Sequence, residues 1–188
     1  MNTQPFPETV PAARILASIL AAGRCPLGPG ASGDGQVRAE LGTLQDAELL
    51  GVPALTDAEA ASAVRSGLLL LTDEIDASHT ISQSIHTPDG SFWHGIMHRR
   101  EPDYPNSKYW FRHGGNHPVY QELATAIDQA GPAASEITAS GSWDPFAMVD
   151  AVEACERGRR SEWREELEAL QQLEALALLA HCYTQAVG

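Results

Sequence analysis

The sequence predicts an all-α protein, an irregular single-domain bundle of about six or seven helices. Apolar residues recur at spacings of three and four in several segments, which is the pattern of amphipathic helices. Val, Ile and Thr do not alternate cleanly with polar residues over five positions, so strands are not indicated. A chain of 188 residues is long enough for one packed domain, and we expect residues 1–188 to form it.

Three helices are expected in the first half of the chain. Apolar spacing predicts one helix over 10–22 and a short one over 43–50. Thr56 is followed by Glu59 in a capping-box pattern, which predicts a helix from Asp57 to about Ile85 with a weak point at Gly67. Residues 24–36 are rich in Pro and Gly and are predicted to form a flexible loop.

The second half is marked by proline residues at expected helix starts and by a turn signal at 87–90. The C-terminal segment has the most regular apolar spacing of the chain. The expected segments are a helix over 91–100, a short helix or irregular stretch over 106–113, helices over 118–130 and 144–158, a loop over 131–142, and the last helix over 161–187.

Composition excludes several classes of function. The net charge of −13 argues against nucleic-acid binding and against anionic membrane surfaces, since both require clustered Lys and Arg. No apolar run approaches the roughly 20 residues of a membrane span. Residues 1–9 lack the charge and the apolar core of a signal peptide. The three cysteines are widely spaced, which predicts free thiols and a cytoplasmic location.

Residues 76–120 form the region where we expect a functional site. Five of the seven histidines lie between 86 and 117, and His79 lies just before them. Four basic and three acidic residues give this window a formal charge of +1, in a strongly acidic chain. The window also contains six aromatic residues. A basic, aromatic, histidine-rich segment of this kind predicts a ligand or metal site.

The first hypothesis is a metal site. His94 and His98 are four residues apart and share one face of a helix, a common spacing for two metal ligands. Asp76 and His79 share a face of the preceding helix in the same way. Packed antiparallel, the two helices would bring these four side chains together around a divalent metal such as Zn, Fe or Mn. Glu101 would join them if its helix continues that far. The alternative is that the histidines cap helices or bond backbone groups.

The second hypothesis is a pocket for a small anionic molecule. Its basic groups would bind a carboxylate or phosphate, and aromatic side chains would form its walls. The alternative is that the basic groups pair internally with the many acidic residues. The predicted ligand-binding residues are Arg99, Arg100, Lys108 and Arg112, with walls from Trp93, Tyr109 and Trp110.

The third hypothesis is acid–base catalysis by His79 or His98 beside a carboxylate such as Glu101, because histidine titrates near neutral pH. Ser78 and Ser82 lack the turn motif of a serine nucleophile.

Taken together, these patterns favour small-molecule binding or catalysis in a His/Arg/aromatic pocket, with or without the assistance of a metal ion. A non-enzymatic interaction or structural domain is the alternative. An exposed, flat patch of Trp93, Tyr109 and Trp110 would favour that alternative. The oligomeric state is left open.

Five sequence stretches resemble a family of bacterial and fungal proteins that has no established activity. They are SHTISQ, WHGIMHRRE, DYPNSKYWFR and HPVY within residues 78–123, and WDPF within residues 142–150. These stretches lie in about a third of the chain. The resemblance implies a shared domain and no catalytic residue.

Overall fold

The computed structural model describes residues 4–30, 35–127 and 131–188. These residues form eleven α-helices and one short 3₁₀ helix and contain no strand. The all-α class is therefore confirmed, and the predicted count of six or seven helices is wrong. None of the helices in the described ranges combines the length and the apolar run that crossing a bilayer requires.

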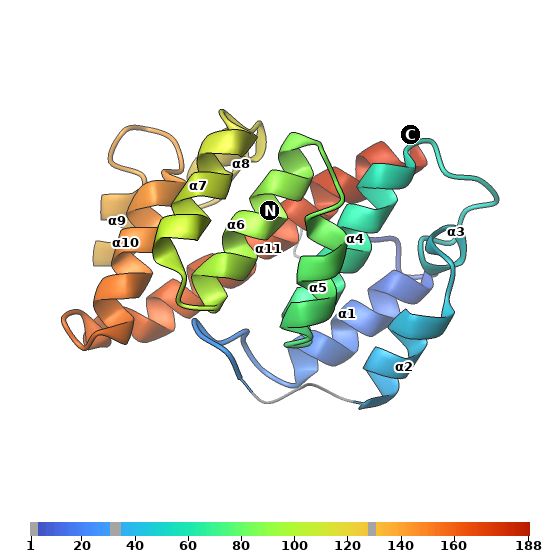
Figure 1. The fold of residues 1–188 in the computed structure, drawn as a ribbon, viewed down its shortest axis with the longest axis horizontal. Helices are drawn as coiled ribbons and strands as arrows, with labels where there is room; N and C mark the ends of the chain where they lie inside the picture. The colour runs from blue at the N-terminus through green and yellow to red at the C-terminus, as the bar shows by residue number, and fades with distance from the viewer. Residues whose placement is uncertain (1–3, 31–34, 128–130) are drawn as a thin grey trace.

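The helices are short except at the C-terminus. Their bounds are α1 Pro11–Ala21, α2 Gly35–Thr43, α3 Asp46–Leu49, α4 Ala58–Leu71, α5 Ile75–Ser82, α6 Pro88–Arg100, α7 Tyr104–Gly114, α8 Val119–Ala126, α9 Pro132–Ile137, α10 Pro145–Glu156, η1 Ser161–Trp163 and α11 Arg164–Val187. In Figure 1 the long α11 runs behind the other helices, with α4 packed against it and with α5, α6 and α7 nearer the viewer.

Two helices lie where helices were not expected. The helix α2 occupies the end of the predicted 24–36 loop and the residues after it. The predicted 43–50 helix is shorter than expected and consists of the single turn of α3. The helix α9 lies inside the predicted 131–142 loop. Both have little apolar periodicity of their own, and Ala133 and Ala134 of α9 pack into the core. Residues 31–34 of the predicted loop and the end of the predicted 118–130 helix lie outside the described residues.

The expected helix from Asp57 to Ile85 is divided into α4 and α5 at Thr72–Glu74. The Thr72 hydroxyl donates to the carbonyl of Leu69 at 2.8 Å, and Asp73 has a φ of 63°. This φ is uncommon for a residue other than glycine, but Asp is one of the residues that tolerates it. The interruption separates α5, which carries His79, from the core helix α4.

Gly67, the expected weak point, lies inside a continuous helix and allows close packing. A Cβ atom there would lie 2.4 Å from the Trp93 ring and 3.0 Å from Leu179. The absence of a side chain therefore lets the buried Trp93 of α6 lie directly on the α4 backbone.

Replacing Gly67 by alanine is expected to lower the free energy of unfolding by about 1–3 kcal/mol, because the added methyl overpacks the Trp93 contact. Gly42→Ala is the matched control, since a Cβ at Gly42 in α2 meets nothing within 4 Å. The control should be neutral or stabilise by up to about 1 kcal/mol through helix propensity. Urea unfolding of both variants measures the difference, and equal effects would contradict this account of Gly67.

Candidate functional site

The helix α6 is the centre of the predicted site region. Thr87 caps it by accepting a hydrogen bond from the Gly90 amide, and Pro88 occupies its first turn. Every residue from Asp89 to Arg100 is buried, because α4, α5 and α7 pack around the helix. Its histidine and arginine side chains therefore have to find partners inside the protein.

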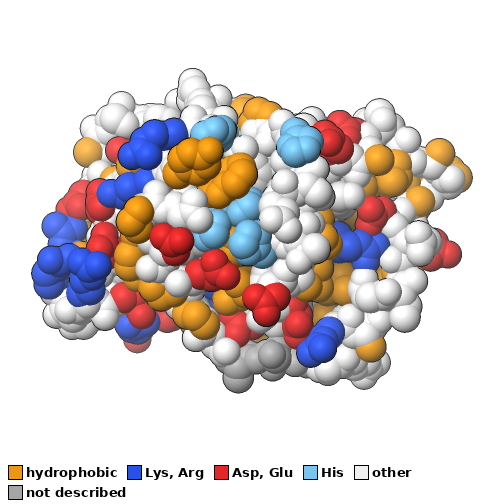
Figure 2. All heavy atoms as spheres, viewed as in Figure 1, with side chains coloured by type: hydrophobic (Ala, Val, Ile, Leu, Met, Phe, Trp, Pro, Cys, Tyr) orange, Lys and Arg blue, Asp and Glu red, His pale blue; other side chains and the backbone are white. Residues whose placement is uncertain are grey.

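Three histidines from two helices meet beside α6. His79 of α5 packs against His94 and His98 of α6, with ring centroids 4.8 Å and 5.2 Å away. The rings of His94 and His98 are stacked 4.7 Å apart, as their four-residue spacing on one helix face requires. One ring nitrogen from each histidine lies within 4.8 Å of the other two. Figure 2 shows histidine side chains gathered at the surface where α5, α6 and α7 meet.

His94 is the innermost member of this histidine cluster. It is 2% exposed, and the Trp110 ring of α7 stacks on it at 3.9 Å with 12° between the planes. Its Nδ1 atom is buried and has no hydrogen-bond partner in the described structure. Burial, with smaller contributions from His98 and His79, lowers the pKa of His94 to about 3. The ring is therefore neutral at physiological pH and has a lone pair for a metal ion.

Two polar side chains approach the ring of His98. Its Nδ1 atom lies 3.1 Å from a carboxylate oxygen of Glu101, and its Nε2 atom lies 3.0 Å from the amide nitrogen of Asn106. The same amide nitrogen lies 3.5 Å from Nδ1, so it sits over the face of the ring and is not in line with the Nε2 lone pair. A carboxylate accepts from a proton donor, so the approach of Glu101 favours the ring proton on Nδ1 and leaves the Nε2 lone pair available. Burial lowers the pKa of His98 against the opposing charge of Glu101. A carboxylate that accepts from the second ring nitrogen is the usual support of a metal-binding histidine.

Asp76 is the predicted metal ligand that stands apart from the histidine cluster. Its side chain is exposed, one turn before His79, and is not among the ligand atoms that lie close together. Glu101 also lies outside this group and contacts the site through His98.

Two of the predicted ligand-binding arginines are completely buried and paired internally. Arg99 makes two contacts with the carboxylate of Glu174 and donates to Gln171 at 3.3 Å. Both members of this pair have fully buried side chains. Trp143 also donates to Glu174, at 3.1 Å. Internal pairing, the alternative considered from the sequence, is thus the arrangement in the structure.

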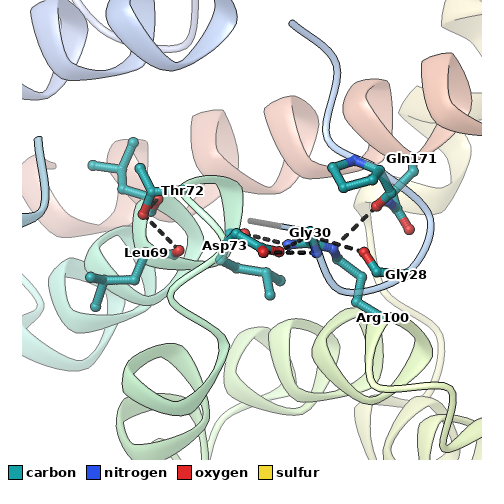
Figure 3. Close-up of polar contacts among 10 residues, drawn as sticks. Gly28, Gly30, Leu69, Thr72, Asp73, Arg100 and Gln171 are labelled. Atoms are coloured by element: carbon teal, nitrogen blue, oxygen red, sulfur yellow. Dashed lines mark hydrogen bonds and ion pairs between the residues drawn. The ribbon is translucent and has the colours of Figure 1, made fainter. Parts of the chain in front are cut away.

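Arg100 joins three separate segments of the chain. It forms an ion pair with Asp73 and donates to the carbonyls of Pro26 at 3.2 Å and Gly28 at 3.4 Å. Asp73 in turn accepts from the Gly30 amide at 2.7 Å. Figure 3 shows this network between α6, the α4–α5 junction and the loop after α1. Arg100 therefore holds the Pro/Gly-rich loop in place, and each of its three side-chain nitrogens donates to a group inside the protein.

The remaining predicted ligand-binding residues do not form one pocket. Lys108 pairs with Asp150 at the surface, and the exposed Arg112 lies over the ring of Phe146. Trp93 is in the core, whereas Tyr109 is 48% exposed. Trp110 is the one predicted wall residue that contacts the histidine cluster.

A second polar cluster joins α6, the loop before α8, and α11. Asp89 accepts from Nε2 of His117 at 2.8 Å and lies 3.3 Å from Nε2 of His181. Gln185 donates to Asp89 at 3.4 Å. Thr87 joins these four residues in lining a cleft of about 300 Å³.

This Asp89 cluster is less suited to a metal than the histidine cluster. The Val119 amide donates to Nδ1 of His117 at 3.3 Å, so the proton of the neutral His117 ring is on Nε2, facing Asp89. Nε2 then has no lone pair for a metal ion. Burial alone would raise the pKa of Asp89, but hydrogen bonds from His117 and His181 outweigh it and lower that pKa. The hydrogen bond between His181 and Asp89 raises the pKa of His181, although burial alone would lower it.

Sequence reasoning missed Asn106 and the role of Asp89 as a partner of two histidines. Asn106 lies eight residues after His98, on the next helix. Helical periodicity does not extend across the break between α6 and α7, so this spacing did not predict the contact. Asp89 lies within the predicted turn at 87–90, and it is 92 residues away from His181 in the sequence.

Comparisons of the chain with protein-family models, curated proteins and solved structures find no match.

Proposed function

We propose that the protein binds a divalent transition-metal ion through His79, His94 and His98 and presents a fourth coordination position to a small ligand. The observation that carries this proposal is the approach of one ring nitrogen from each histidine to within 4.8 Å of the other two. Tetrahedral zinc has metal–nitrogen bonds of about 2.0–2.1 Å, which sets its ligand nitrogens about 3.3 Å apart. Rotation of the side chains by a small amount would close the remaining distance.

The protonation state of the cluster supports this proposal. A metal ion needs neutral imidazole, and the lowered pKa values of His94 and His98 favour that form. A buried polar atom without a partner, such as Nδ1 of His94, lowers the stability of the protein. A metal ion bound to this nitrogen would give it a partner. If Nδ1 carries the ring proton, a metal-bound ligand could accept that proton in a hydrogen bond. Glu101 orients His98 as a carboxylate does behind a ligating histidine.

Zinc is the metal we expect among Zn, Fe and Mn. Three imidazoles without a carboxylate ligand suit Zn and other borderline metals, whereas Mn favours oxygen ligands. Three protein ligands also leave a position for water, as in catalytic zinc sites. Such a water ionises near neutral pH and can act as a nucleophile, so metal-assisted hydrolysis is the reaction class that this arrangement favours.

The small anionic molecule expected from the sequence would bind, in this proposal, to the metal and not to the arginines.

The three cysteines of the chain are buried and unpaired, which suits the reducing cytoplasm we expect for this protein. The alternative of an interaction domain has less support, because Trp93 is buried and Tyr109 alone is an exposed large apolar side chain in the described residues.

The test is a titration of tag-free protein with Zn²⁺, followed by calorimetry and by metal analysis after dialysis. We expect one bound ion per chain. His79→Ala, His94→Ala and His98→Ala should each weaken binding at least tenfold, through loss of one of three ligands. The matched control is His86→Ala, since His86 is an exposed histidine in the same region and outside the cluster. Absence of stoichiometric binding, or equal affinity in all four variants, would refute the proposal.

A further inference from the structure

We propose that a cavity between α1, the loop after it and the α4–α5 junction binds a small neutral molecule that has an apolar body and one hydroxyl or N–H group. None of the residues that line this cavity belongs to the histidine cluster. The inference therefore does not depend on the proposed metal site and goes beyond it.

The size and the walls of the cavity suit a small organic molecule. Its volume is about 230 Å³. An apolar cavity of about 150 Å³ is enough to hold benzene, so this one has room for a ring with a small substituent. The apolar walls include the half-buried Ile19 of α1 and Leu71 of α4 and the buried Val37 of α2. Mostly apolar walls with a few polar groups are typical of small-molecule sites.

The hydrogen-bond network around Arg100 fixes one side of this cavity. Asp73 lines the cavity, forms an ion pair with the buried Arg100 and accepts from the Gly30 amide at 2.7 Å. Arg100 also donates to the carbonyl of Pro26 at 3.2 Å. Figure 3 shows these contacts, which join the α4–α5 junction to the loop after α1. The loop is held in place before any ligand arrives, so binding does not include the cost of ordering it.

The charged groups in the cavity walls favour a neutral ligand. Asp73 is already paired with Arg100, and the exposed Arg24 donates to the carbonyl of Glu165, which does not line the cavity. Burial raises the pKa of the Cys25 thiol, so this wall group is also uncharged at neutral pH. A charge placed among these walls would lose water without gaining a counter-charge, and that is costly.

Two hydroxyl groups give the cavity its preference for a hydrogen-bond donor. The Ser18 hydroxyl donates to the carbonyl of Arg14 at 3.2 Å, and the Thr72 hydroxyl donates to the carbonyl of Leu69 at 2.8 Å. A hydroxyl has one proton and two lone pairs, so each of these groups can still accept once its proton is used. A hydroxyl or N–H group on the ligand matches such acceptors.

The first test measures ligand class by NMR titration of three molecules of similar size. Benzyl alcohol should bind at one site per chain. Toluene, which lacks the donor, should bind about fivefold more weakly, the value of one neutral hydrogen bond. Benzoate should bind at least about tenfold more weakly, because its charge would enter a mostly apolar cavity. Equal affinity for benzyl alcohol and either comparison molecule would overturn the assigned class.

The second test places the ligand in the cavity. Ile19→Trp puts an indole ring into the space, so the affinity for benzyl alcohol should fall at least about tenfold, because a filled cavity has no room for a ligand. Leu20→Trp is the matched control, since Leu20 is the next half-buried residue of α1 and does not line the cavity. If Ile19→Trp folds poorly, the exposed rim residue Ala22 allows a second comparison. Ala22→Leu should weaken binding, and Ala21→Leu outside the cavity should not.

Alkylation of Cys25 by N-ethylmaleimide gives an independent readout. Cys25 lines the cavity and is 8% exposed, whereas Cys155 and Cys182 are 1% and 0% exposed. Bound benzyl alcohol should slow the alkylation of Cys25, measured by peptide mass spectrometry. Slower alkylation together with weaker binding in Ile19→Trp or Ala22→Leu supports the proposal. Absence of binding, equal loss of affinity in the control variants, or an alkylation rate that bound benzyl alcohol does not change would overturn it.

Discussion

Glu174→Ala is expected to lower the free energy of unfolding by about 3–5 kcal/mol, the cost of leaving one member of a buried ion pair without its partner. The Arg99 guanidinium would remain fully buried, and among the described residues Gln171 would be its remaining hydrogen-bond partner. The indole N–H of Trp143 would also lose its acceptor. For a domain of this size, such a loss is a large fraction of the total stability.

A surface pair provides the matched control for this prediction. Glu153 and Arg157 lie four residues apart on α10, and the Arg157 side chain is 60% exposed. Glu153→Ala should cost less than about 1 kcal/mol, as exposed pairs generally do. The double variant Arg99→Met/Glu174→Met should recover part of the lost stability, since no charge is left buried. Urea unfolding measures all three, and similar costs for Glu174→Ala and Glu153→Ala would contradict the assigned role of the buried pair.

Local signals predicted most of the helix starts in this chain. Asp144 caps α10 as expected, by accepting hydrogen bonds from the amides of its first turn. The helix α4 begins one residue later than expected, and its cap is Asp57 instead of the predicted Thr56. The ends were harder to predict. The break at Thr72–Glu74 depends on Asp73, whose carboxylate binds Arg100, 27 residues further along the chain. No pattern within α4 or α5 contains that information.

The same division between local and distant contacts applies to the candidate site. The spacing of His94 and His98 was sufficient to place both rings on one face of α6, and the adjacent helix brings His79 to them. The partners of the arginines were not predictable in this way. Arg99 finds its counter-charge 75 residues away on α11, so spacing did not distinguish a buried structural arginine from a ligand-binding one.

Asp89→Asn is expected to lower the free energy of unfolding by about 2–3 kcal/mol near pH 5.5, through the loss of charged hydrogen bonds in the Asp89 cluster. Asp89 is 6% exposed and is the common acceptor for His117, His181 and Gln185. Asparagine has the same shape but no charge, so the cleft would keep its form while the protonated His181 loses its counter-charge. Urea unfolding of native and variant protein at that pH measures the difference.

The pH dependence of this difference follows from the two pKa shifts. The pKa of Asp89 is lowered on folding, so its contribution is complete above about pH 4, the unfolded value, and is lost as the pH falls below it. The pKa of His181 is raised by Asp89, so its contribution is complete below about pH 6.5 and is lost as the pH rises through the folded value.

The stability difference between native protein and Asp89→Asn should therefore be largest between about pH 4 and pH 6.5 and should decrease on both sides. Glu122 also raises the pKa of His181, so a smaller alkaline dependence should persist in the variant. His181→Gln provides the matched test, because it should remove the alkaline limb while His117 and Gln185 keep the acidic one. A difference that stays constant from pH 3 to pH 9 would show that neither the ionisation of Asp89 nor that of His181 contributes to it, and would contradict a charge-based link between α6 and α11.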